Sequence, residues 1–222
     1  VNVAIVKNDD DDIEGYLVYR LGAPEIIVSE LVYTRRRGQR ALLNYIYNHR
    51  SQGESIRWNE GLHDVGFRLH PDGKTGHTTM PFMMARVVDV PLAFAQVGAT
   101  AFTESLPGQD VESLLAESGA SMDDIETTFT MAVDDTLCDW NQGIYRIEVT
   151  FGGHVKSTKI NEAPNGGLVD VSTDIGALSL LLMGAMSAEE LIFEGRLAIG
   201  EDMEGVLDTY WPKQKCYINE WW

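Results

Sequence analysis

The chain has 222 residues, of which 44% are apolar, so it is long enough to form one large domain or two ordinary ones with real cores. Thirty-four acidic residues against seventeen basic ones give a formal net charge of −17. This balance disfavours nucleic acid and anionic membranes as partners, because both need a basic surface. It fits a cationic small substrate, a salty cytoplasm or simply a solvated surface.

Targeting signals and metal motifs are also missing from the sequence. It contains no apolar run of about eighteen residues and no secretory leader, so we expect neither a transmembrane helix nor export. Cys138 and Cys216 are far apart and the five histidines are scattered, so no metal site is predicted. A reduced cytoplasmic setting follows as the default. The chain starts at Val1 without Met and enters a strand at once, which suggests a fragment or a processed chain.

The first part of the chain reads as strands around one helix. Alternating or β-branched apolar residues predict strands at Asn2–Val6, Gly15–Arg20, Glu25–Val32 and Ser55–Trp58. Helical spacing of leucine and isoleucine predicts a helix that Thr34 caps and that runs to about His49. The acidic turn Asn8–Asp12 lacks the ligand order of a calcium loop. A short helix is predicted at His63–Leu69, followed by a loop at Pro71–Gly76.

The second part begins with a predicted strand at Phe82–Val90. Pro91 then opens a helix to about Val97, and another helix is expected near Val111–Glu117. Further strands are expected at Thr127–Val133, Ile144–Phe151, His154–Ile160 and Val169–Ser172, with Gly152-Gly153 as a hairpin turn. The last helices are expected at Ile175–Met183 (capped by Thr173 or Asp174), from the Ser187 capping box to Phe193, and at Glu201–Tyr210. The two blocks, 1–82 and 83–222, both read as α+β.

Two short motifs leave alternatives open. Cys138–Gly143 contains turn-forming residues, so we interpret it as a turn with Trp140 packed beneath it. Arg86 and Asp89 lie close together in an apolar segment. They form either a structural ion pair or a site in which the carboxylate faces a cationic substrate.

The C-terminal tail is unusual because it ends in Trp221 and Trp222, after Tyr217 and Ile218. Two indole rings are costly to leave in water, since each aromatic side chain can bury about 150–250 Å². The tail therefore either docks its rings on its own domain and does nothing more, or it also buries the terminal α-carboxylate. A docked carboxylate is a fixed anion that can accept a proton during catalysis.

Several of these segments together resemble a known family. Met84–Ala93 is similar to the M-x-R-h-h-D-h segment (h, apolar) that opens the last domain of the Eis-type (enhanced intracellular survival) GCN5-related N-acetyltransferases. The residues from Asp135 to Gly143 match that family's D-x-x-x-x-W-N-x-G turn. Its closing helices and aromatic tail resemble Leu178–Gly184, Ser187–Leu191, Gly195–Leu197 and the last residues of this chain.

The resemblance implies an α+β fold in two parts. Residues 1–82 would be a partial GCN5-related acetyltransferase-like domain, and residues 83–222 a sterol-carrier-protein-2-like domain. The family's cofactor loop has Gly or Ala where this chain has Arg40, after Arg35 and Gly38. The loop is therefore expected to be degenerate, no residue here is assigned to acetyl-CoA, and the cofactor is expected to bind an N-terminal domain that this chain lacks.

The resemblance also implies site residues and partners. The α-carboxylate of Trp222 would be the general base that takes a proton from a primary-amine substrate, while a tyrosine of the absent domain would be the general acid. Asp89, Glu220 and Trp221 would lie at the substrate pocket. The family forms homo-oligomers, including hexamers, and the isolated chain is expected to be inactive.

Two other functions remain open. The second block could carry a lipid or another hydrophobe, but Leu178, Leu181, Leu182, Leu191 and Ile192 are no more than a core requires. The chain could also serve only as an oligomerisation module.

Overall fold

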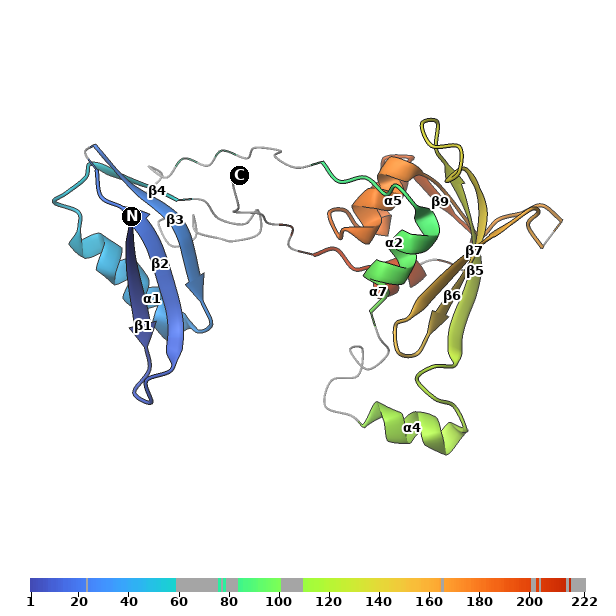
Figure 1. The fold of residues 1–222 in the computed structure, drawn as a ribbon, viewed down its shortest axis with the longest axis horizontal. Helices are drawn as coiled ribbons and strands as arrows, with labels where there is room; N and C mark the ends of the chain where they lie inside the picture. Colours follow the sequence, from blue (N-terminus) through green and yellow to red (C-terminus); the bar gives the residue numbers. More distant parts are fainter. Residues whose placement is uncertain are drawn as a thin grey trace. The chain divides into compact units, whose positions relative to one another are not determined.

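The fold is described from a computed structural model, whose ribbon is drawn in Figure 1. The structure describes residues 1–22, 24–58, 76, 78, 84–100, 110–164, 166–200, 203, 205–214 and 216. These residues belong to two compact units, the first within Val1–Met80 and the second within Pro81–Cys216. Among the described helices, none is long and apolar enough to cross a membrane.

The first unit is a mixed four-stranded sheet with one helix. In chain order its elements are β1 (Asn2–Lys7), β2 (Ile13–Arg20), β3 (Glu25–Tyr33), α1 (Arg36–Asn48) and β4 (Ser55–Trp58). β1, β2 and β3 are antiparallel neighbours, whereas β4 joins β3 in parallel after the crossover through α1. Helix α1 packs Leu42 and Ile46 against core residues of the sheet, among them Leu17 and Ile26.

The beginning of α1 differs from the sequence prediction. The helix is capped by Arg35, without a side-chain hydrogen bond, and not by Thr34. Thr34 instead donates its backbone N–H to the carbonyl oxygen of Glu14 at 3.0 Å. The helix approaches the sheet closely here, because a Cβ on Gly38 would lie 2.7 Å from that same carbonyl oxygen. The glycine is therefore needed for helix–sheet packing.

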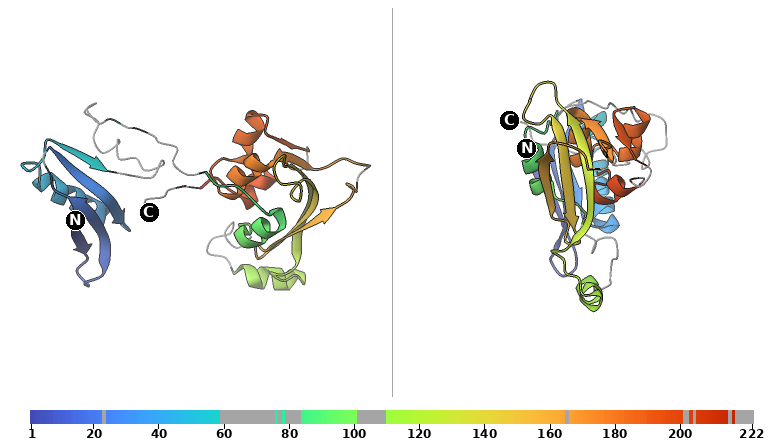
Figure 2. Two further views of the ribbon diagram at one scale, coloured as in Figure 1. Left: turned by 45° about the horizontal axis from the view of Figure 1, so that its top comes forward. Right: turned by 90° about the vertical axis from the view of Figure 1, so that its right-hand side faces the viewer.

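The second unit is a five-stranded sheet with helices α2, α5, α6 and α7 on one face, whereas α4 lies beyond the end of the strands (Figures 1 and 2). Its strands are β5 (Ile125–Asp134), β6 (Gly143–Thr150), β7 (Val155–Ile160), β8 (Val171–Asp174) and β9 (Leu197–Ile199), in the order β7-β6-β5-β8-β9. Its helices are α2 (Val90–Val97), α4 (Val111–Ser118), α5 (Ile175–Leu182), α6 (Ala188–Phe193) and α7 (Val206–Tyr210). β5 and β8 run parallel, so both end at the same edge of the sheet.

The core of the second unit lies between the sheet and its helices. Alternate residues of the central strands, such as Met131, Tyr145 and Ile147, are buried there against Phe94 and Leu178. The other face of the sheet is uncovered by any described helix, as the right-hand view of Figure 2 shows.

Some local predictions for the second unit are confirmed and others are wrong. Asp174 caps α5 by accepting the N–H of Ala177, and the Ser187 capping box is present. The strand predicted at Phe82–Val90 is wrong over its described part, because residues 84–89 are irregular before α2 begins. β9 was not predicted, and the final helix begins at Val206, later than predicted. The helix predicted at His63–Leu69 and most of the following loop lie outside the described residues.

Candidate functional site

A buried carboxylate lies at the centre of the motif between β5 and β6. The side chain of Asp135 is 0% exposed and forms an ion pair with Arg86, which is 49 residues away in sequence. Asp135 also accepts hydrogen bonds from the N–H groups of Leu137 and Cys138 and from the side chain of Asn141, each at 3.0 Å. A buried charge with this many partners is compensated by its surroundings.

These contacts determine the protonation state of Asp135. Burial raises the pKa of its carboxyl, but the hydrogen bonds from Asn141, from the backbone of Leu137 and Cys138 and from Arg86 outweigh burial. The pKa is lowered from 3.8 to about 2. Asp135 is therefore an anion at neutral pH, and its role is to hold its partners rather than to exchange a proton.

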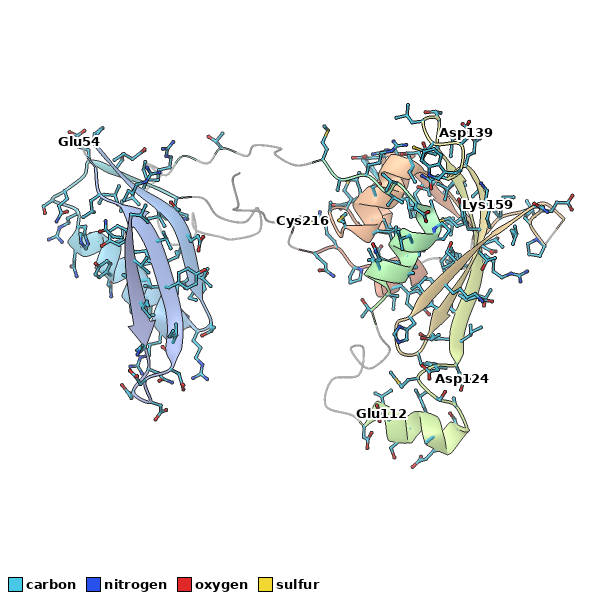
Figure 3. The ribbon with its side chains drawn as sticks, viewed as in Figure 1. Glu54, Glu112, Asp124, Asp139, Lys159 and Cys216 are labelled. Atoms are coloured by element: carbon cyan, nitrogen blue, oxygen red, sulfur yellow. The ribbon has the colours of Figure 1, made fainter. Side chains whose placement is uncertain are left out.

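The neighbouring Asn141 and Trp140 attach the entry segment of the unit to this motif. The amide oxygen of Asn141 accepts the N–H of Val90 at 3.1 Å, and its amide nitrogen donates to the carbonyl oxygen of Val88 at 3.2 Å. The indole N–H of Trp140 donates to the same carbonyl at 2.7 Å. Lys159, labelled on β7 in Figure 3, donates to the carbonyl oxygen of Trp140 at 2.9 Å. The segment around residues 86–90 is thus fixed in place.

Two sequence interpretations are corrected here. Arg86 does not pair with Asp89, because it turns to Asp135, and Asp89 instead caps α2 by accepting the N–H of Leu92 at 2.8 Å. Trp140 is not packed beneath its turn but is 64% exposed. The buried residue of the turn is Asn141, at 1% exposure, because one amide group can satisfy both a donor and an acceptor of the adjacent backbone.

Of the four residues predicted to act in the site, the structure describes only Asp89. Asp89 is exposed, and its second carboxylate oxygen has no hydrogen-bond partner among the described residues. Glu220, Trp221 and Trp222 lie outside the described residues. The structure thus neither brings these three residues to Asp89 nor separates them from it.

The loop that resembles the family's cofactor loop leads into the first turn of α1, which is rich in arginine. The first turn of α1 carries Arg37, whose guanidinium pairs with Asp9 at 3.1 Å and lies 4.0 Å from the Glu14 carboxylate. Glu14 is only 5% exposed, and one of its carboxylate oxygens has no hydrogen bond to a described residue. The Arg37 guanidinium is therefore already paired with acidic side chains.

The cysteines and the candidate metal ligands are described next. Cys138 is half-buried and Cys216 exposed, and both are free thiols. In the described ranges, no three histidine, cysteine or acidic side chains cluster as a metal site would require.

Comparison with family models identifies the two units. An acetyltransferase (GNAT) domain model matches residues 1–87, and a sterol carrier protein domain model matches residues 111–219. The chain thus has a GNAT-like domain followed by a sterol-carrier-like domain. The α+β fold class that the sequence predicted, with these two domains in this order, is confirmed.

Solved structures share the same fold. A probable N-acyltransferase from Enterococcus faecalis V583 aligns at 23% identity and a TM-score of 0.68, over 95% of this chain and 46% of its own. A GCN5-related N-acetyltransferase from Anabaena variabilis aligns at 18% and 0.65, over 92% and 46%. Eis1 from Mycobacterium abscessus aligns at 18% and 0.55, over 93% and 48%.

The chain spans less than half the length of these solved structures, and at such identities the likeness establishes the fold alone. A search of curated proteins found no match.

Proposed function

We propose that this chain is part of an Eis-like GCN5-related N-acetyltransferase that transfers acetyl from acetyl-CoA to a primary amine. Residues 1–82 would be its central, degenerate acetyltransferase domain and residues 83–222 its sterol-carrier-protein-2-like domain. The observation that carries the proposal is the succession of a GNAT domain and a sterol carrier domain in one chain. The idea that acetyl-CoA binds to another domain rests on the family resemblance, from whose cofactor loop this chain departs at Arg40.

The proposed chemistry uses the end of this chain. The α-carboxylate of Trp222 takes a proton from the substrate ammonium, and the free amine then attacks the thioester carbonyl of acetyl-CoA. The thiolate of coenzyme A leaves with a proton from a tyrosine of the cofactor-binding domain. Asp89, Glu220 and Trp221 would form the substrate pocket, where their carboxylates favour the ammonium.

The first experiment is the intact mass of the native polypeptide in its source cells. A chain longer by about 150–200 residues, roughly one further domain, would supply a cofactor site. The full polypeptide should then release coenzyme A from acetyl-CoA when a panel of primary amines is added, whereas residues 1–222 alone should not. A native polypeptide that starts near Val1 would contradict the proposal, because it would lack the cofactor-binding domain.

The role of the terminal carboxylate is tested in the full polypeptide. Deleting Trp222, or extending the chain beyond it, moves the carboxylate and should lower kcat by about 10²–10⁴-fold, the usual contribution of a general base. Trp222→Phe is the matched control, since it keeps the carboxylate in place and changes only the ring. Full activity after C-terminal extension would show that the carboxylate is not the base.

A lipid carrier is the second candidate, because the matched model of the second unit is a sterol carrier domain. A carrier needs an apolar cavity, yet Leu178, Leu181, Leu182 and Leu191 are all buried in the core and only Ile192 is partly exposed. Native mass spectrometry distinguishes the two functions. Lipid retained by the purified chain would favour the carrier, and a bare chain the transferase.

The assembly and location of the protein belong to the same proposal. We expect a homo-oligomer in the cytoplasm, as in the family that the sequence resembles. Light scattering of the full polypeptide tests the assembly, and a monomer would leave the catalytic proposal standing while removing this part of it.

A further inference from the structure

A groove of about 560 Å³ opens on the second unit, where β5 and β8 end. Its lining comes from both of these strands, from the start of β6 and from the segment between α6 and β9. Small-molecule sites usually have about 300–1,000 Å³, and sheets with parallel strands often bind ligands beyond the carboxyl ends of those strands. The groove has a suitable size and position for a ligand.

The floor of the groove is a single row of residues across four strands. Ile144 pairs with Ala132, Ala132 with Ser172, and Ser172 with Ala198. These residues alternate with buried neighbours and therefore face the side of the sheet that no described helix covers. Three of the four are small, which leaves space above the sheet. The right-hand view of Figure 2 shows this face.

The wall of the groove carries an unbalanced negative charge. Asp134 and Asp174 are register partners at the ends of β5 and β8, so their side chains start from adjacent positions on the same face. Asp174 is satisfied, because Arg196 donates to both of its carboxylate oxygens, at 3.0 and 2.7 Å, and Ala177 adds its N–H at 2.9 Å. The side chain of Asp134 is exposed and forms no hydrogen bond or ion pair with a described residue.

Because Asp174 is paired and Asp134 is not, the groove favours a positively charged ligand. Arg196 balances Asp174, so the Asp134 carboxylate gives the lining one net negative charge. The chain as a whole carries −17, which disfavours anions further. The amide of Gln142 and the hydroxyl of Ser172 also line the groove and can bind polar groups. The groove therefore matches a small organic cation with polar substituents.

We propose that this groove binds a small molecule with a primary ammonium group, which pairs with Asp134 while the rest of the ligand lies on the Ala132–Ser172–Ala198 floor. The groove is formed by the second unit alone, and binding requires neither acetyl-CoA nor acetyl transfer. The proposal is therefore independent of the proposed transferase function, and either one can fail without the other.

The test is a titration of the ¹⁵N-labelled chain with 1,4-diaminobutane, followed by NMR at physiological salt. We expect saturable shifts of amides near Ala132–Asp134, Gly143, Ser172–Asp174 and Arg196, and none of comparable size with neutral 1,4-butanediol. Shifts spread over the acidic surface, shifts that do not saturate, or equal binding of the diol would overturn the proposal.

Two variants locate the interaction. Asp134→Asn should weaken diaminobutane binding at least about tenfold, the size expected when a charged hydrogen bond is lost. Asp139→Asn makes the same charge change in the exposed loop labelled in Figure 3, outside the lining, and should leave binding unchanged. Equal weakening by both variants would show general attraction to an acidic surface. Ala198→Leu fills the floor without a change of charge and should also abolish binding, and unchanged binding would contradict the groove.

Discussion

The side chain of Asn141 forms hydrogen bonds with two backbone groups and one carboxylate. Its replacement by alanine therefore measures how much these bonds contribute to the stability of the second unit. The change removes hydrogen bonds to the N–H of Val90, to the carbonyl oxygen of Val88 and to the Asp135 carboxylate. Each such bond contributes about 1 kcal/mol net, and the buried N–H of Val90 is left without a partner. We therefore expect the free energy of unfolding of the second unit to fall by about 3 kcal/mol.

Thermal unfolding measured by calorimetry tests this value. For a unit of the size of Pro81–Cys216, 1 kcal/mol corresponds to about 3 °C in Tm, so Asn141→Ala should lower Tm by about 10 °C. Asn161→Ala is the control, since Asn161 is an exposed residue of the same unit with no hydrogen bond to a described residue. If both variants unfold at the same temperature, the assigned role of Asn141 is wrong.

Two further predictions concern pH. The pKa of Asp135 is lowered to about 2, so the ionised carboxylate stabilises the fold above about pH 4, and this contribution is lost as the pH falls through 2. The difference in Tm between wild type and Asp135→Asn should therefore shrink as the pH falls from 4 to 2. A difference in Tm that stays constant over this range would contradict the prediction. The hydrogen bond with Tyr45, followed by burial, raises the pKa of Tyr19 to about 12, so its contribution is present below pH 10 and is lost as the pH rises through 12. Tyr45→Phe should lower the Tyr19 pKa seen by NMR titration, whereas Tyr47→Phe, at an exposed site, should not.

Local patterns in the sequence were enough to predict most strands and the caps of α5 and α6. The strand at Ser55–Trp58 and the helix from Pro91 to Val97 could be read from alternation, periodicity and proline placement, and both are present. Asp174 was one of two predicted caps, and the capping box at Ser187 has the predicted form. These features depend on residues within a few positions of each other, so their signal is contained in short stretches of sequence.

The candidate sites depend instead on contacts between distant residues. Nothing near Arg86 in the sequence indicates Asp135, and so the nearby Asp89 was the natural but wrong partner. The sequence also predicted a packed Trp140, whereas the structure buries Asn141. Both side chains donate to the carbonyl oxygen of Val88, which is more than 50 residues away in sequence, so this contact could not be predicted from the turn alone.

The sequence by itself determined the order of the two domains, the acidic character and most local elements. The tertiary structure alone decided which charges are balanced. Asp134 and Asp174 are 40 residues apart in sequence and become neighbours only because β5 and β8 pair in parallel. Arg196 then reaches Asp174 from a third segment and leaves the Asp134 side chain without a partner among the described residues. Pairings of this kind follow from sheet register and chain crossover, which no short stretch of sequence encodes.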